Sequence, residues 1–242
     1  QAIHGAKVFS DYFDKFDGIA DYIRDQKVST VEKMSFGLPG MGPEIDLFDN
    51  FDMHPEDMNI EIHEMNQNMW DIYVKIISSH SNMTSIPGKS LRLGVLETNS
   101  KKWLGFIRIG SPVINMKPRN QLLDCVFTQD AKTAVSFNKT SIMGFAIVPS
   151  QPFGFNYLGG KLLAGICCSH FVRERMNTKY PGMNTCLFET TSLYGSSKSS
   201  SQYDGMKPFL RFKGLTDSNF LPLMHGKPYD DLRDYMEKAV GE

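Results

Sequence analysis

Cysteine is scarce in this chain, with four residues among 242. Cys167 and Cys168 are adjacent, and none of the four has the Cys-x-x-Cys spacing of zinc ribbons or redox motifs. The pattern therefore predicts neither a disulfide framework nor a metal site. Cys167 and His170 are close enough in sequence to share one side of a helix, but no third ligand accompanies them. Buried cysteines on an apolar helix face usually belong to a core.

Long apolar runs are also absent. The longest ones are much shorter than the ~18 residues that a membrane-spanning helix needs. The first residues are charged and polar, unlike a secretory signal peptide. We therefore expect no membrane segment and a cytoplasmic protein, in the host cell cytoplasm if a bacteriophage encodes it.

The basic part of the chain lacks a compact cluster of carboxylates, which disfavours a nuclease. Residues 1–75 contain 6 Lys/Arg and 15 Asp/Glu, whereas residues 76–226 contain 17 Lys/Arg and 7 Asp/Glu. This division has two interpretations that the sequence leaves open. The basic part binds a polyanion or a phosphate-bearing cofactor, or the acidic part packs near the basic part and neutralises it.

The order of sequence patterns predicts an α+β (mixed α/β) protein. Helical periodicity occurs within 6–34, 61–80 and 156–178. Alternation and apolar runs predict a hairpin over 91–110, strands over 140–148 and 185–193, and a short last strand at 208–213. We divide the chain into an acidic helical or arm-like segment (1–88), a sheet core (89–226) and a C-terminal helix (227–242).

One segment, 147–164, reads as a strand, a turn with Pro149, Pro152 and Gly154, and a helix start with paired glycines. A glycine-rich helix start presents unpaired N–H groups and the positive end of the helix dipole, which together suit a phosphate. The alternative is a tight turn without a ligand. The residues assigned to a bound donor are Gln151, Phe153, Gly154, Asn156, Tyr157, Gly159, Gly160 and Lys161.

This order of elements resembles the GNAT-type acyltransferase fold: a central mixed sheet with a long helix after the central strand. In that family the turn holds the pyrophosphate of acyl-coenzyme A through a Gln/Arg-x-x-Gly-x-Gly/Ala motif. Gln151-Pro-Phe-Gly154 supplies its first half, but Asn156 stands where the second glycine is expected. The resemblance implies acyl-coenzyme A, or another phosphate-bearing donor, as cofactor.

A closer resemblance to a known family is carried by the segments Trp103-Leu-Gly-Phe-Ile-Arg-Ile-Gly-Ser-Pro112, Gln151-Pro-Phe-Gly-Phe-Asn-Tyr-Leu-Gly-Gly-Lys-Leu-Leu-Ala164, and Thr190-Thr-Ser-Leu-Tyr-Gly195 with Ser201-Gln-Tyr-Asp204. They resemble the family of DruA, a component of the Druantia anti-phage system, and its phage-borne relatives. More remotely the chain is similar to the bacteriophage Mom proteins, which are GNAT-like and modify adenine in DNA. These resemblances imply nucleic-acid modification or phage–host conflict.

Polar side chains follow the strand predicted over 185–193, where ligands of open α/β sheets gather. We assign Thr190, Thr191, Ser192 and Tyr194 to substrate binding, with an ordinary strand exit as the alternative. Tyr203, with Asp204 beside it, follows a serine-rich loop. The GNAT resemblance implies a tyrosine here as general acid towards a leaving thiolate, and the alternative is a surface tyrosine.

Glu189 is a lone carboxylate in an otherwise apolar strand, a position that is costly unless the group is paired or functional. It either deprotonates an attacking amine or pairs with an arginine such as Arg108, which we also assign to substrate binding. Aromatic residues such as Trp103 and Phe106 serve either as stacking surfaces for an extruded base or as core.

The leading hypothesis is a GNAT-like transferase that modifies nucleic acid in phage DNA modification or phage–host conflict. A non-catalytic nucleic-acid-binding module of a defence or counter-defence system is the main alternative. A third hypothesis is a virion or complex-assembly component that docks on a protein partner through the acidic segment 41–64.

Overall fold

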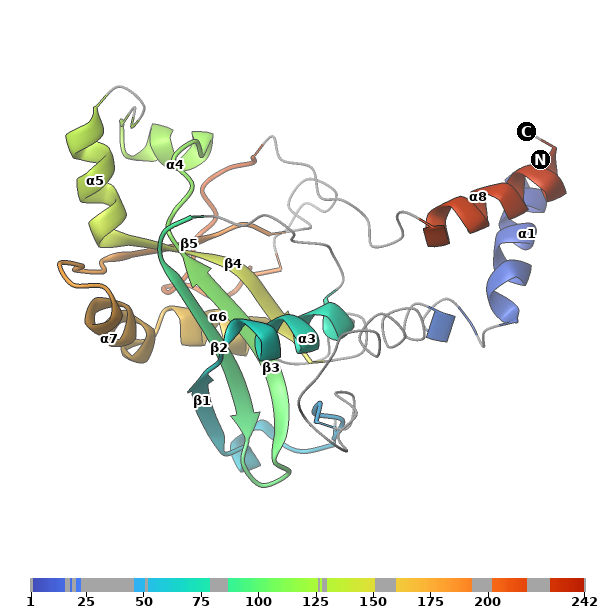
Figure 1. Cartoon of the computed structure of the whole chain (residues 1–242), viewed down its shortest axis with the longest axis horizontal. Coiled ribbons are helices and arrows are strands. Elements are labelled where there is room, and N and C mark those ends of the chain that lie inside the picture. The colour runs from blue at the N-terminus through green and yellow to red at the C-terminus, as the bar shows by residue number, and fades with distance from the viewer. Residues whose placement is uncertain are drawn as a thin grey trace.

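A five-stranded mixed sheet forms the centre of the computed structural model, which describes residues 2–15, 18, 21–22, 46–50, 52–78, 87–125, 127, 130–150, 160–192, 202–216 and 227–241 (Figure 1). Its spatial order follows the chain: β1 (Ile60–Glu64), β2 (Ser90–Glu97), β3 (Lys102–Gly110), β4 (Ser141–Pro149) and β5 (Leu187–Thr190). The pairs from β1 to β4 are antiparallel, and β4 and β5 are parallel. This confirms the expected α+β class.

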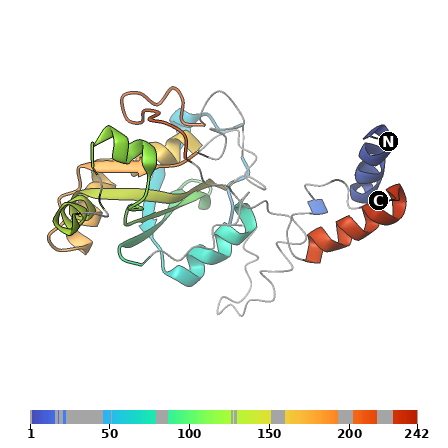
Figure 2. The ribbon, with the colours of Figure 1, turned by 90° about the horizontal axis from the view of Figure 1, so that it is seen from above.

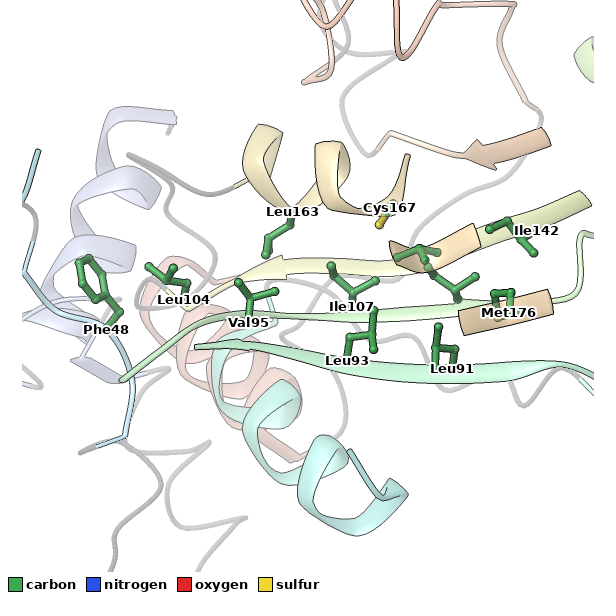
Figure 3. Packing of buried hydrophobic residues seen from close by; sticks show 12 residues of the cluster. Phe48, Leu91, Leu93, Val95, Leu104, Ile107, Ile142, Leu163, Cys167 and Met176 are labelled. Atoms are coloured by element: carbon green, nitrogen blue, oxygen red, sulfur yellow. The ribbon is translucent and has the colours of Figure 1, made fainter. Parts of the chain in front are cut away.

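Helices cover both faces of the sheet. On one face, α6 (Gly160–Cys167) and α7 (His170–Lys179) bury the larger core, shown in Figure 3. On the other, α3 (Gln67–Ile77) packs Trp70 and Tyr73 against Phe106 of β3. The larger core comprises Phe48, Leu91, Leu93, Val95, Leu104, Ile107, Ile109, Ile142, Leu163, Cys167, Val172 and Met176.

The hairpin predicted over 91–110 is confirmed as β2 and β3. Leu91, Leu93 and Val95 are fully buried, as expected for strand residues that alternate towards a core. Trp103 and Phe106 pack in the cluster under α3, so the core interpretation of these aromatic residues is confirmed. The parallel pairing of β4 with β5 fits the strand–helix–strand unit predicted across 140–193.

Two predicted helices have different boundaries in the structure. The described part of the helix predicted over 61–80, residues 61–78, contains most of β1 and all of α3 rather than one helix, because Ile60–Glu64 pairs with β2 and Asn66 caps α3 through its side chain. The helix predicted over 156–178 breaks between α6 and α7, because the Ser169 hydroxyl accepts from the Val172 N–H and starts a new helix.

Other parts of the prediction were wrong or incomplete. The last strand expected at 208–213 is a turn and irregular chain. The sequence did not predict α4 (Lys117–Leu122) or α5 (Ala131–Thr140), which lie between β3 and β4 along the chain. α5 is capped by Asp130, whose carboxylate accepts from the Lys132 N–H.

Acidic side chains of the N-terminal part meet basic side chains of the core. Glu64 of β1 pairs with Arg175 and Lys179 of α7, and Asp49 accepts from Lys102 at 2.7 Å. Burial alone would raise the pKa of Glu64, but its hydrogen bonds to Lys179 and Arg175 lower it. Part of the charge division in the sequence is therefore neutralised within the fold.

Two terminal helices form a separate pair. α1 (Ala2–Asp14) and α8 (Lys227–Val240) lie side by side, apart from the sheet (Figures 1 and 2). Their contact is an aromatic and aliphatic cluster of Tyr12, Phe13, Tyr22, Leu232 and Met236. The helix expected over 227–242 is confirmed as α8. Among the described residues, no helix has the length and apolar character to cross a membrane.

The turn between β2 and β3 is organised around a buried carboxylate. Glu97 is fully buried and accepts hydrogen bonds from the N–H groups of Asn59, Asn99 and Ser100 and from the Ser100 hydroxyl. Burial would raise the pKa of Glu97, but these hydrogen bonds, from Ser100 first, hold it below its ordinary value. The ionised carboxylate therefore fixes both the turn and the chain entering β1.

We expect Glu97→Gln to lower the free energy of unfolding at pH 7 by about 2 kcal/mol, because an amide group then faces N–H donors. Urea unfolding is the measurement, with exposed Glu174→Gln as the control. Because folding lowers the pKa, the wild-type contribution is present above the ordinary value near 4.5 and is lost as pH falls through the folded-state pKa. A stability gap that persists unchanged at pH 3 would contradict this role.

Candidate active site

Three elements converge at the carboxyl end of β5, where Thr190 pairs with Gly144 in the middle of β4. The first is the start of α6, where Lys161 Nζ lies 3.5 Å from the position that a Cβ on Gly205 would occupy. The second is the end of β5, where the Thr190 hydroxyl donates to the Gly144 carbonyl at 2.9 Å. The third is the turn 202–206, in which the Gln202 N–H donates a hydrogen bond to the hydroxyl of Ser192, just after β5, at 3.4 Å. Carboxyl ends of parallel strands are where α/β sheets bind ligands.

Tyr203 stands at the centre of this convergence. Its hydroxyl is hydrogen-bonded to Thr190, and Cys167 of α6 is close enough to act on it electrostatically. Burial raises the pKa of Tyr203 to about 12, although its hydrogen bonds with Gln202 and Thr190 act in the opposite direction. Tyr203 therefore keeps its proton at neutral pH and can act there as a hydrogen-bond or proton donor, not as a base.

The thiols beside the site are part of the core. Cys167 is 2% exposed, and its pKa is raised by burial first and by neighbouring Cys168 second. A buried thiol with a raised pKa is a poor nucleophile and a poor metal ligand. Within the described ranges, no group of three or more His, Cys, Asp or Glu side chains could hold a metal ion.

Glu189 pairs with an arginine, but its partner is Arg119 rather than Arg108. Arg119 Nη1 donates to both carboxylate oxygens, at 3.0 and 3.3 Å, and Nη2 donates to the Ile114 carbonyl at 3.1 Å. Burial raises the pKa of Glu189, and Arg119 opposes that rise. The guanidinium lies beside two rings that stack on each other, 5.1 Å from the centre of Phe127 and 4.3 Å from that of Phe137. This geometry favours a structural role in joining α4 to β5.

Arg108 lies on the opposite face of the sheet from Tyr203. It lies two residues after Phe106 on β3 and so on the same face as α3. In the register of β2 and β3 it is opposite Arg92. Its guanidinium carbon is 5.9 Å from the centre of the Phe145 ring. Burial lowers the pKa of Arg108, and the like charge of Arg92 lowers it further. The structure thus separates Arg108 from the Thr190 and Tyr203 hydroxyls, with which the sequence had grouped it.

A family model described as Druantia protein DruA matches residues 14–197, which is more than half of the chain. The chain belongs to the DruA family. The family provides a component of the Druantia anti-phage defence system, and the resemblance drawn from the sequence segments is confirmed. Comparison with curated proteins and with solved structures gave no match.

The DruA match encloses all five strands but ends before the turn that carries Tyr203. Thr190, Thr191, Ser192, Gly160 and Lys161 belong to the matched region and are described by the structure. Asp204, which lies beyond it, is exposed. The predicted site residues outside the described residues are Gln151, Phe153, Gly154, Asn156, Tyr157, Gly159 and Tyr194.

Sequence reasoning missed two buried cations of this DruA-family chain. Arg119 is 5% exposed, and Lys89 is 8% exposed with Nζ donating to the Ser141 and Asn138 carbonyls. Burial lowers the pKa of Lys89 to about 8. Neither residue was distinguished in the sequence, because the carbonyl partners of Lys89 and the Glu189 partner of Arg119 are far away along the chain.

Proposed function

We propose that this DruA-family protein transfers a group from a phosphate-bearing donor to nucleic acid. The donor would lie at 151–161, and Tyr203 would donate a proton in the transfer. The observation that supports this proposal is the hydrogen-bonded pair of Tyr203 and Thr190 next to α6, whose Lys161 side chain reaches the same turn at Gly205. The turn 202–206 thus brings a protonated phenol to the end of the sheet where a donor on α6 would present its reactive end.

The residues at the start of α6 are compatible with a phosphate. Gly160 and Lys161 are the first residues of an eight-residue helix, and their N–H groups belong to the unpaired first turn. Lys161 is exposed and adds a positive charge. Such a helix start attracts an anion through its dipole as well as its N–H groups.

The proposed chemistry assigns one task to each described side chain. A bound acyl thioester would supply the acyl group, so that a C–N bond forms at a nucleobase amine while the C–S bond breaks. Tyr203 would give its proton to the departing sulfur, with Thr190 fixing the direction of the hydroxyl. Asp204, exposed in the same turn, would take the proton that the amine loses. Positioning and proton transfer would carry most of the acceleration.

Non-catalytic nucleic-acid binding is the second candidate, and one observation favours it. Arg119 engages both oxygens of Glu189, so this carboxylate is occupied as an ion pair rather than available as a base. A DruA-family chain that binds nucleic acid without modifying it would need the basic surface but not the Tyr203 hydroxyl. Mass spectrometry of nucleosides from cells that express the protein separates the two, because only the transferase leaves an adduct.

We expect Gly160→Asp to weaken binding of acyl-coenzyme A or ATP by about tenfold or more, because it places a carboxylate beside the bound phosphate. Isothermal titration calorimetry is the measurement. Gly165→Asp is the matched control: it adds the same charge to the same helix, at a position with no atom within 4 Å of the new Cβ. If the wild-type protein binds neither ligand, or both variants weaken binding equally, the donor site at α6 is wrong.

A further inference from the structure

An irregular strip over 207–215 exposes aromatic and basic side chains together. Phe209 is 69% exposed, Phe212 is 62% exposed and Leu215 is 57% exposed. Lys207, Arg211 and Lys213 alternate with them and are exposed too. Between 205 and 216 the sequence contains no acidic residue. Exposed apolar side chains that gather in one segment mark a surface that another molecule covers.

The backbone of this strip is held at both ends. At its start, Met206 is buried, and its carbonyl accepts from the N–H groups of Phe209 and Leu210 at 2.9 and 3.2 Å. Near its end, Gly214 has φ +146° and lies against Pro118 of α4, which a Cβ would approach to 2.9 Å. Only glycine allows this approach. The rings are therefore presented by an anchored segment, and exposed Lys117 of α4 extends its positive charge.

The charges of the strip are available to a ligand. Among the described residues, Lys207, Arg211 and Lys213 make no ion pair, in contrast to Lys102, Arg175 and Lys179, which hold carboxylates of the N-terminal part. Aromatic rings interleaved with cations are what a single-stranded nucleic acid needs: bases stack on the rings while phosphates contact the cations. A duplex hides its base faces, so it would use the cations alone.

We infer that the 207–215 strip binds single-stranded nucleic acid by stacking unpaired bases on Phe209 and Phe212. The inference rests on the proposed function, because the strip begins three residues after Asp204 and would lead the strand towards the Tyr203 hydroxyl. It specifies the acceptor in that proposal: the base that receives the transferred group belongs to single-stranded nucleic acid. DNA and RNA share the required chemistry.

The test is fluorescence anisotropy of the full chain with labelled oligothymidine and oligouridine of about 20 nucleotides, longer than the ~4–16 nucleotides that one such site covers. A duplex of the same length and heparin are the comparison ligands. We expect Phe209→Ala with Phe212→Ala to weaken single-strand binding by about tenfold or more and to leave heparin binding unchanged. Tighter binding of oligothymidine would indicate single-stranded DNA as the ligand, and tighter binding of oligouridine would indicate RNA.

The contribution of the basic side chains to binding is tested by the salt dependence of the affinity. Arg211→Ala with Lys213→Ala should reduce the slope of log K against log salt by about 1.4, because two phosphate contacts are lost from a single strand. Phe209→Ala with Phe212→Ala should leave that slope unchanged. Phe171→Ala on α7 is the matched aromatic control, because its ring is 41% exposed on a helix outside the strip.

Several results would overturn the inference: binding by the Phe209/Phe212 variant equal to wild type, a duplex bound as tightly as the single strand, or no nucleic-acid binding at all. Capture of a protein partner that depends on these rings, without oligonucleotide binding, would replace it with a protein-docking surface. Failure here is distinct from failure of the transferase proposal. A nucleoside adduct made equally by the wild-type and ring variants would support the transferase and reject the strip.

Discussion

Tyr203→Phe will reduce turnover by roughly 10²-fold or more once the transferred group is known, because it removes the only proton that this side chain can give to a leaving group. The change leaves the ring volume intact, so packing against α6 and β5 is preserved. The hydrogen bonds lost are those of the hydroxyl with Gln202 and Thr190. The measurement is the rate of nucleoside modification, with donor affinity by calorimetry as the companion readout. We expect affinity to stay near the wild-type value.

Tyr229→Phe provides the control for this prediction, because Tyr229 is 49% exposed on α8, in the helix pair apart from the sheet. The pH profile gives a second readout. With a pKa of about 12, Tyr203 stays protonated through the neutral and mildly alkaline range, so its ionisation should not reduce the rate below about pH 10. Full activity in Tyr203→Phe would place Tyr203 among structural residues and favour the binding-module alternative.

Arg119→Met is expected to lower the free energy of unfolding by about 3–5 kcal/mol at neutral pH, because it leaves the Glu189 carboxylate buried without its partner. The side chains of this pair are 6% and 10% exposed, so water cannot replace the guanidinium. Adding Glu189→Leu to the variant should recover much of the loss, since the uncompensated charge is then gone. Urea unfolding of both single variants and the double variant is the measurement.

The pH dependence of the stability loss in Arg119→Met distinguishes loss of the ion pair from loss of packing. Folding raises the pKa of Glu189 through burial, and loss of Arg119 removes the interaction that opposes this rise. A group with a raised folded-state pKa contributes fully below its ordinary value near 4.5 and loses that contribution as pH rises. The Arg119→Met defect should therefore be smallest near pH 4.5 and largest at neutrality. A defect that does not vary with pH would indicate lost packing against Phe127 and Phe137.

The exposed pair Lys227–Asp231 is the control for the ion-pair argument. Its side chains are 82% and 50% exposed, so solvent screens their attraction. Lys227→Met should leave the urea unfolding midpoint unchanged within error. A loss comparable to that of Arg119→Met would show that burial is not what distinguishes the two pairs.

Local patterns in the sequence predicted the sheet better than they predicted the contacts that define the site. The alternation of Leu91, Leu93 and Val95 was sufficient for β2, because strand periodicity is a local signal. The Glu189 partner was missed because Arg119 is 70 residues away in sequence, in a helix that the sequence did not predict. The break before α7 was missed because Ser169 lies within a continuous helical pattern.

Tyr203 was singled out by family resemblance and Thr190 by its position at the end of a strand, but no sequence pattern predicted their contact. The structure places the two hydroxyls together, and it places Gly205 near Lys161. Their chemical roles stay predictions, as does the donor site, most of which lies outside the described residues. The exposed rings at Phe209 and Phe212 had no sequence signal as a surface, because the segment was predicted to be a strand.

The single parallel pair at the end of the sheet has a consequence for how the protein folds. β2 and β3 meet through a short turn, so their pairing closes a small loop and costs little chain entropy. β4 and β5 meet only across α6 and α7, and the Arg119 contact closes a longer loop still. Topology therefore favours a folding order that starts at the hairpin and finishes at β5. The edge that carries Thr190 is completed last, so a nascent or partly unfolded chain holds a sheet that still lacks β5.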